Sequence, residues 1–165
     1  MCGKTIVTNW SKPAQPNGYL ESHVRILLNS FRHWTGKSLV QQNLSSNQQA
    51  RQLFYAPFVV LSHDTGVDPL LNYANQAGLR LFELNWKELT ALPSRLTAEP
   101  MHRDERARLL GRVTQQDYID DYSGVRISKT GRRFLIERAV VWNVRDDQGA
   151  PYGQAATFSA WRFLD

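Results

Sequence analysis

One stretch of the sequence, Leu70 to Phe82 (LLNYANQAGLRLF), constrains the fold more than any other. It starts as an apolar run typical of a buried strand and changes to a helical pattern directly after Asn75. Asparagine suits such a change, because its side-chain oxygen can accept a hydrogen bond from an unpaired backbone N–H at a helix start. The pattern therefore predicts a strand that leads directly into a short helix. Asn75-Gln76-Ala77 is neither a glycine-rich phosphate loop nor the turn that presents a catalytic serine.

The chain before this junction divides into a polar arm and a helical part. Residues 1–18 are polar, contain prolines and show no periodicity, so we expect an irregular arm. Residues 19–55 are expected to form N-terminal helices, because apolar residues recur at helical spacing over 19–34 and a second helical segment lies within 46–55. The remaining residues, 56–165, are expected to form the main domain.

The helix expected over 19–34 carries a broad apolar stripe. Burial of each large side chain is favourable by roughly 1.5 to 3 kcal/mol, so the stripe must be covered by the chain's own sheet or by a second subunit. Because two-fold dimers are the commonest assembly, we expect a homodimer to which this helix contributes. The candidate interface residues are Leu20, Val24, Leu27, Phe31 and Trp34.

The rest of the chain predicts an antiparallel sheet with helices between its second and third strands. Short helices are expected after the capping pair Asn85 and Glu88, and over 104–115. A tight hairpin is expected at Gly131, since glycine accepts the positive φ that such turns need. The five predicted strands are 58–64, 69–74, 124–129, 133–145 and 152–164.

Charge and composition exclude several classes of partner. The net charge is +5, but acidic residues interrupt the basic group around 103–112, which is typical of a solvated helix face. We therefore expect no nucleic-acid partner. No segment approaches the roughly 20 apolar residues that a membrane-spanning helix needs, so no membrane partner is expected. Cys2 is the only cysteine, which excludes an internal disulfide and favours a cytoplasmic location.

Longer motifs resemble a known family. The segment LLNYANQAGLRLFEL resembles the second strand and following helix of PAS domains. More specifically, four blocks together resemble the MEKHLA domain family, a PAS-related group found as small bacterial proteins and at the C-terminus of plant class III homeodomain leucine-zipper proteins. These blocks are LPSRLTAEP, RDERARLL, YIDDYSGVRISKTGRRFLIERAVVWNV and YGQAATFSAW.

The resemblance implies an α+β fold, with a PAS-like five-stranded antiparallel sheet, helices on one face and an N-terminal helical extension. It also implies a role in sensing or in regulating association, without defining a ligand. No homeodomain or zipper is present, so DNA binding gains no support. PAS relatives that trap a flavin need a cysteine in the domain, and Cys2 lies far outside it in sequence. We expect no cofactor, although reversible flavin binding remains an alternative, and the lone His102 and the adjacent Asp120 and Asp121 predict neither a haem nor a metal site.

Polar residues inside the apolar strands are the candidate ligand-binding positions. Alternation in 133–145 places Phe134, Ile136, Val140, Trp142 and Val144 on one face, with Arg138 interrupting them. If Glu137 faces inward, it needs a guanidinium partner, and Arg126 across the hairpin is the expected one. The alternative is that both groups lie in water at strand edges. The full candidate set is Arg95, Arg106, Tyr122, Arg126, Glu137 and Trp142, with a place in the core as the alternative for Trp142.

These observations favour a non-catalytic, PAS-like domain that senses a small molecule between its helices and its sheet. Such a pocket should have mainly apolar walls, with Arg or Tyr at its mouth. One alternative is a protein-association module with a filled core and no ligand. Another is a small α+β enzyme, although no histidine and carboxylate pair marks a catalytic site. His63, which ends the first expected strand, is interpreted as structural or exposed.

Overall fold

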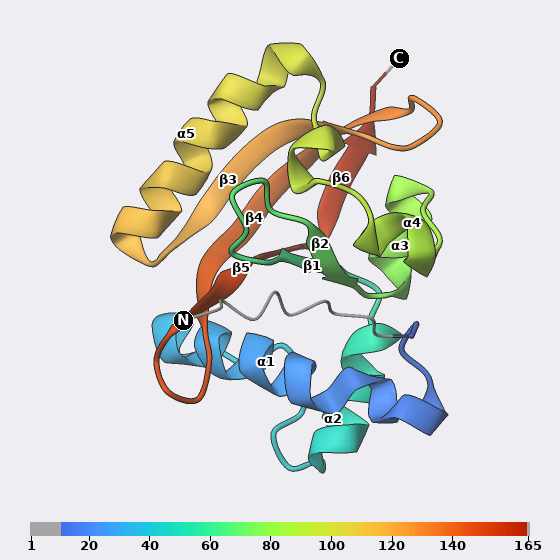
Figure 1. Ribbon diagram of the computed structural model, residues 1–165, viewed down its shortest axis with the longest axis vertical. Coiled ribbons are helices and arrows are strands. Elements are labelled where there is room, and N and C mark those ends of the chain that lie inside the picture. The colour runs from blue at the N-terminus through green and yellow to red at the C-terminus, as the bar shows by residue number, and fades with distance from the viewer. Residues whose placement is uncertain (1–10, 165) are drawn as a thin grey trace.

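The computed structural model describes residues 11–164, which form one antiparallel sheet with helices on both of its faces (Figure 1). The helices are the 3-10 helix η1 (Gln15–Leu20), α1 (Glu21–Thr35), α2 (Ser46–Phe54), α3 (Gln76–Phe82), α4 (Trp86–Thr90), the 3-10 helix η2 (Ser94–Thr97) and α5 (Pro100–Gln116). The strands are β1 (Val59–His63), β2 (Leu71–Ala74), β3 (Tyr118–Ile127), β4 (Arg133–Arg145), β5 (Pro151–Phe158) and β6 (Ala160–Phe163). The predicted arm, 1–18, lies outside the described residues up to position 10, and η1 occupies its end.

The strand order is β2-β1-β5-β4-β3, and β6 also pairs with β4. Every pairing is antiparallel, so the predicted fold class is confirmed. The expected last strand, 152–164, is interrupted at Ser159, which divides it into β5 and β6 and makes six strands instead of five. β3 begins at Tyr118, well before the predicted 124, and α5 begins at Pro100 instead of 104.

Each face of the sheet carries its own core. On one face, α1 and α2 cover a cluster that includes Leu27, Phe31, Leu53 and Trp142. On the other face, α3 and α5 cover a second cluster that includes Phe82, Leu109, Tyr122, Phe134 and Phe158. Figure 1 shows this division, with α1 and α2 below the sheet and α5 along its upper side. Helix α5 thus lies on the opposite face of the sheet from the N-terminal helices, whereas Leu79 of α3 and Trp86 and Leu89 of α4 pack into the first cluster.

The junction at Asn75 has the predicted conformation, and its side chain makes four hydrogen bonds. Its oxygen accepts from the backbone N–H of Gly78 at 3.1 Å, which caps α3, and from that of Val60 at 3.0 Å. Its amide nitrogen donates to the carbonyl oxygens of Leu53 at 3.1 Å and Phe58 at 2.8 Å. Asn75 is completely buried, so this one side chain joins α2, β1 and α3.

The predicted division of residues between the two faces of β4 is wrong beyond Arg138. Arg138 has φ +51° and interrupts the regular pairing of β4. The side chains after Arg138 therefore lie on the opposite face from the one that simple alternation predicts. Phe134 and Ile136 therefore share a face with Ala139 and Val141. The other predicted members of that face lie under α1 on the opposite side of the sheet: Val140, Trp142 and Val144.

The apolar stripe of α1 packs on the chain's own sheet. Val24, Leu27 and Phe31 are at most 4% exposed in the single chain. Leu20 and Trp34 are partly buried against the same cluster, and the Trp34 indole N–H donates to the carbonyl oxygen of Asn143 at 2.9 Å. β4 and its neighbours therefore already cover Val24, Leu27 and Phe31 within the single chain, and the homodimer stays a prediction.

Local signals elsewhere place the ends of elements correctly. Gly36 ends α1 with φ +70°, and Gly131 has φ +90° in the β3–β4 turn. Asn85 and Glu88 form the expected capping box at the start of α4. Within the described part of the chain, no helix combines the length and the apolar character that crossing a bilayer would require.

Candidate functional site

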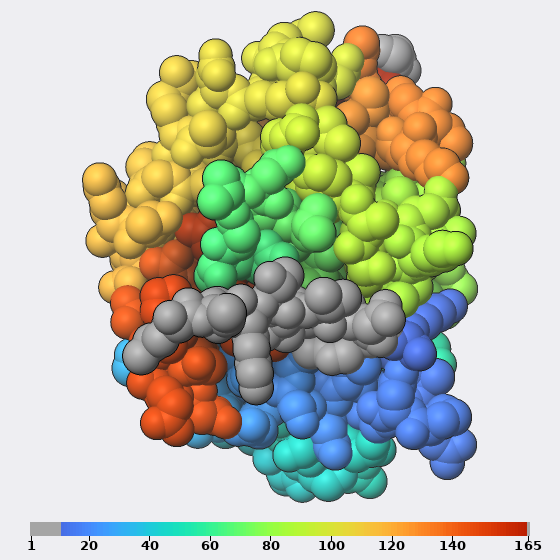
Figure 2. Space-filling model, viewed as in Figure 1, coloured from blue at the N-terminus to red at the C-terminus, as the bar shows by residue number. Residues whose placement is uncertain are grey.

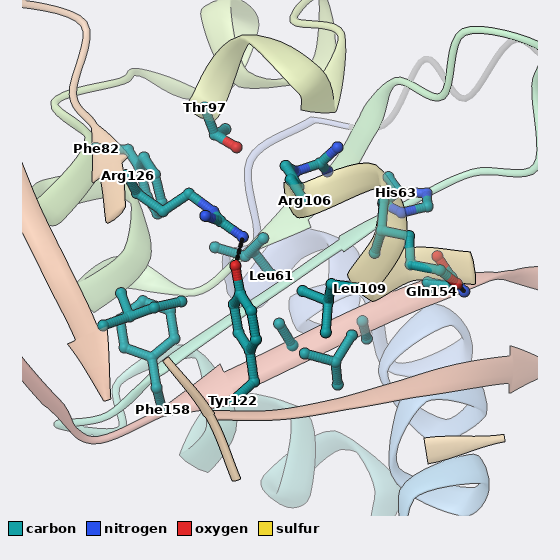
Figure 3. A pocket seen from close by; sticks show the side chains of 15 residues that line it. Leu61, His63, Phe82, Thr97, Arg106, Leu109, Tyr122, Arg126, Gln154 and Phe158 are labelled. Atoms are coloured by element: carbon teal, nitrogen blue, oxygen red, sulfur yellow. Dashed lines mark hydrogen bonds between the residues drawn. The ribbon is translucent and has the colours of Figure 1, made fainter. Parts of the chain in front are cut away.

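A cavity of about 50 Å³ lies between the sheet and the helices α3, η2 and α5. Apolar side chains form its walls, and polar groups from β1, β3, β5 and α5 enter it (Figure 3). Its lining residues are Leu61, His63, Phe82, Thr97, Arg106, Leu109, Leu110, Tyr122, Arg126, Ile136, Val141, Gln154, Ala155, Ala156 and Phe158. Larger surface hollows of 240 to 460 Å³ are also present, two of which share lining residues with this cavity. Ligand sites combine apolar walls with a few convergent polar groups, as this cavity does.

A surface loop and η2 contact each other next to the cavity. The loop between β1 and β2 lies beside η2 and α5 in the space-filling view, where it is the green segment next to yellow-green and yellow ones (Figure 2). Asp68 in this loop accepts two hydrogen bonds from Arg95 of η2, the shorter at 3.1 Å. Leu70 also forms an isolated β-bridge with Pro93. The loop and η2 are therefore joined to each other, and Thr97 of η2 lines the cavity.

Arg126 is buried inside the cavity without a carboxylate partner among the described residues. It projects from β3 and is only 7% exposed. Its guanidinium donates to the carbonyl oxygen of Val125 at 2.8 Å and to the hydroxyl oxygen of Tyr122 at 3.0 Å. It also lies 5.4 Å from the centre of the Tyr122 ring, where the π-electrons attract its charge. These contacts hold the guanidinium but leave its charge unneutralised.

Arg106 brings a second guanidinium from α5. Within the described residues it has neither a hydrogen-bond partner nor an ion-pair partner. Burial and, to a smaller extent, the positive charge of Arg126 together lower the pKa of Arg106 to about 10, and Tyr122 partly opposes this change. A pKa of about 10 still leaves the side chain protonated at neutral pH. Two positive charges therefore face one small cavity.

His63 adds a buried imidazole at the end of β1. Its Nδ1 lies 2.8 Å from the carbonyl oxygen of Asp64, which can only accept, so Nδ1 carries the hydrogen in the neutral ring. Nε2 then presents a lone pair and is buried without a hydrogen bond of normal geometry among the described residues, although the Gln154 side chain lies close enough to influence the pKa of the ring. Burial lowers the pKa of His63, and the charge of Arg106 contributes in the same direction.

Gln154 lies beside His63 but uses its amide N–H groups elsewhere. Its two amide hydrogens face three acceptors: the carbonyl oxygen of Leu110 at 3.3 Å, the hydroxyl of Thr114 at 3.2 Å and the side-chain oxygen of Asn143 at 3.0 Å from Nε2, so at least one hydrogen is shared. These bonds tie the C-terminal half of α5 to β4 and β5. Asn143 strengthens this anchor, because its amide donates to the carbonyl oxygen at Val113 at 3.0 Å.

Three of the six predicted ligand-binding residues meet in this cavity: Arg106, Tyr122 and Arg126. Arg95 lies outside it, in the surface contact with Asp68. Glu137 does not pair with Arg126. It accepts a hydrogen bond from Arg162 of β6 at 3.1 Å, and its side chain is 38% exposed.

Trp142 also lies away from the cavity, on the other face of the sheet. It is completely buried under α1, and its indole N–H donates to the carbonyl oxygen of Leu27 at 3.3 Å. The core position is the alternative expected for Trp142, and it follows from the interruption of alternation at Arg138. The predicted pairing of Glu137 with Arg126 fails for another reason, because Arg126 lies opposite Phe134 in the β3–β4 register.

His63 and Gln154 are cavity residues that sequence reasoning missed. A signal for His63 existed, because Val59, Leu61 and His63 alternate along β1 and two-residue spacing places them on one face. Gln154 carries no comparable signal, since its position opposite His63 depends on the pairing of β1 with β5, strands that are far apart in sequence.

Comparisons with known proteins agree with this architecture. The homeobox-leucine zipper protein ATHB-9 of Arabidopsis thaliana is 28% identical over 146 residues, which cover 86% of this chain and 17% of that protein. The chain thus spans about a sixth of the length of that relative.

Two solved structures show the fold. The crystal structure of a PAS domain from Colwellia psychrerythraea has a TM-score of 0.58 at 14% identity, covering 71% of this chain and 94% of that one. A light-oxygen-voltage domain studied with a flavin analogue has a TM-score of 0.53 at 16% identity, covering 72% and 85%. The fold is therefore PAS-like. Because the model of the MEKHLA domain matches residues 21–163, this chain belongs to the MEKHLA domain family.

Proposed function

We propose that this MEKHLA domain is a non-catalytic sensory or regulatory domain, in which a small molecule enters the cavity under α5 and changes how α5 packs on the sheet. The observation that carries the proposal is the convergence of Arg106, Arg126 and His63 from three separate elements on one cavity. Buried polar groups normally have partners. Groups that lack them in the described chain are candidates for contacts with a ligand.

The packing of α5 suggests how such binding would be transmitted. Its buried residues, Leu109 and Val113, both lie in its C-terminal half, which Asn143 and Gln154 also anchor to the sheet. The N-terminal half carries no buried residue. A ligand that draws Arg106 towards the sheet would therefore tilt or order this less constrained half.

The cavity does not fit a flavin in this conformation. Pockets for drug-sized ligands measure about 300 to 1,000 Å³, whereas this cavity measures about 50 Å³. The non-catalytic part of the proposal follows from the lining: Thr97 is its single aliphatic hydroxyl, and that hydroxyl donates to the carbonyl oxygen of Ser94 at 2.7 Å instead of to a histidine. The lining therefore offers neither an activated nucleophile nor a pair of carboxylates.

Hydrogen exchange and thermal denaturation with a panel of small metabolites test this proposal. A ligand of the cavity should raise the midpoint of unfolding and slow amide exchange in residues 100–108 more than in 109–116. Ala156→Leu should abolish both effects, because it adds three carbon atoms to the cavity wall. Ala150→Leu, at an exposed turn position, should leave them unchanged.

Two outcomes would count against a sensing role. One is a panel in which no compound stabilises the protein, and the other is stabilisation that Ala156→Leu leaves intact. In either case an association module becomes the better proposal, and light scattering would then measure whether the chain self-associates at tens of micromolar protein.

A further inference from the structure

The cavity has an excess of positive charge that no residue of its lining neutralises. Arg106 and Arg126 both face it, and in the described chain no Asp or Glu is among its lining residues. The nearest acidic residue in sequence to His63 is Asp64, whose carboxylate accepts the backbone N–H groups of Gly66 and Leu70, each at 3.0 Å, in the β1–β2 loop. Burial of cations without a counter-charge is unfavourable, so an anion would relieve this arrangement.

Hydrogen-bond donors for an anion are present and unused. A guanidinium has five N–H groups, and Arg126 uses one from each terminal nitrogen in the contacts described above. Arg106 uses none of its own within the described residues. The Tyr122 hydroxyl accepts from Arg126, which leaves its own hydrogen free to donate. His63 Nε2 would become a further donor on protonation, which an adjacent anion favours and which burial and the neighbouring Arg106 oppose.

The size and walls of the cavity restrict the anion further. An engineered apolar cavity of about 150 Å³ binds benzene, and this cavity is about a third as large. Leu61, Leu109, Val141 and Phe158 give it apolar walls that a short alkyl chain would contact. A planar carboxylate also matches the fork of a guanidinium, with two parallel N–H···O hydrogen bonds.

We propose that the ligand of this cavity is a short-chain carboxylate of about two to four carbons, with its carboxylate between Arg106 and Arg126 and its alkyl end against the apolar wall. This inference rests on the proposed sensing function and assigns a chemical class to its ligand. The carboxylate supplies the missing negative charge. The alkyl end contacts the apolar wall, which a fully hydrated inorganic ion would not do.

The test compares sodium propionate with propionamide, which has the same shape without the charge, and with inorganic phosphate, at matched ionic strength and pH 7. Isothermal calorimetry or carbon-13 NMR of labelled propionate measures the affinity. We expect propionate to bind at millimolar concentration, and propionamide and phosphate to bind at least tenfold more weakly. Arg106→Gln should weaken propionate at least tenfold, while Arg108→Gln, an exposed position on the same helix, should have no effect.

The contrary outcomes distinguish a failure of the carboxylate proposal from a failure of the sensing function. Equal binding of propionamide, or unchanged propionate binding by Arg106→Gln, would refute the proposal that the ligand is a carboxylate. The sensing function would still stand if the metabolite panel reveals another ligand whose binding Ala156→Leu abolishes. Equal binding of phosphate would show that the alkyl chain contributes nothing. If no compound of the panel binds either, the sensing function itself fails. Arg106 is used in preference to Arg126 because it makes no structural hydrogen bond within the described chain, and circular dichroism confirms that the variant is folded.

Discussion

The side chain of Tyr122 occupies the space in which a β-carbon of Gly124 would lie. A methyl group at Gly124 would collide with the hydroxyl and the adjoining ring carbons of Tyr122, although the backbone of Gly124 has no positive φ. The glycine thus serves to admit the ring whose hydroxyl accepts a hydrogen bond from Arg126. The short sequence Tyr-Ser-Gly in β3 therefore sets the position of a polar group in the cavity.

Gly124→Ala should displace Tyr122 and break its hydrogen bond with Arg126. We expect the free energy of unfolding to fall by about 1 to 3 kcal/mol, the usual cost of overpacking a buried position. Urea denaturation measures this cost, and repeating the substitution in a Tyr122→Leu background tests its cause. The cost should be at least halved there, because the colliding ring is absent. An equal cost in both backgrounds would show that another contact of Gly124 is responsible.

The second prediction concerns the two asparagines that begin helices. Asn75→Asp should lower the free energy of unfolding by about 3 kcal/mol or more at pH 7, because the carbonyl oxygens of Leu53 and Phe58 lose their donors and face a buried carboxylate. The same change at Asn85 should cost less than about 0.5 kcal/mol, since aspartate caps a helix as well as asparagine does.

Chemical denaturation of the two Asn→Asp variants checks this difference. Both side-chain oxygens accept a helix-capping hydrogen bond, so the difference between the variants isolates the bonds that Asn75 makes to α2 and β1. Similar costs at the two positions would mean that Asn75 acts only as a cap.

How much of the fold could be predicted depended on whether the signal was local. The Asn75 junction, the Asn85 capping box and the turn at Gly131 each involve a few consecutive residues, and all three were predicted correctly. The sequence also predicted that the α1 stripe is buried, but it did not identify the surface that covers the stripe. Apolar periodicity shows that a face must be covered, whereas the identity of the covering surface depends on the pairing of distant strands.

The candidate site was predicted less completely, for a similar reason. Arg106, Tyr122 and Arg126 were identified, but only the packing of α5 against β3 shows that they share a cavity. Trp142 lies beyond Arg138, which reverses the alternation of β4, so it occupies the core, the alternative expected for it. Glu137 precedes Arg138 and does not meet Arg126, because Arg126 lies opposite Phe134 in the hairpin register. Sequence alternation assumes regular pairing, and a one-residue irregularity exchanges the two faces of a strand.

The third prediction concerns acid stability and His23 of α1. His23 is buried between the Tyr152 hydroxyl, 2.8 Å from Nδ1, and the Ser62 hydroxyl, 3.2 Å from Nε2. Ser62 donates its own hydrogen to Asn72 at 2.5 Å, so Nε2 donates to Ser62 and the ring is neutral. Burial lowers the pKa of His23 from 6.5 to about 3. The unfolded chain therefore binds a proton more readily than the folded chain between these pH values.

Because of this difference in proton binding, the free energy of unfolding should fall as the pH is lowered. The stabilising contribution of neutral His23 is complete above pH 6.5 and declines as the pH falls towards about 3, by at most about 1.4 kcal/mol per pH unit. Urea denaturation at pH 7, 6 and 5 measures this slope. His23→Gln should be less stable at pH 7 but should show a shallower slope, whereas His33→Gln, at an exposed position of α1, should retain the wild-type slope. A His23→Gln slope equal to that of the wild type would contradict the prediction.

The last prediction tests the backbone of β4 at Arg138, which has φ +51° and an exposed side chain. At an ordinary strand position, glycine is less stable than alanine, because it loses more conformational freedom on folding. A positive φ reverses this order, since a β-carbon there is strained by about 1 to 2 kcal/mol. Arg138→Gly should therefore be more stable than Arg138→Ala by about 1 kcal/mol in thermal or urea denaturation. If the alanine variant is the more stable, Arg138 does not hold the left-handed conformation that exchanges the faces of β4.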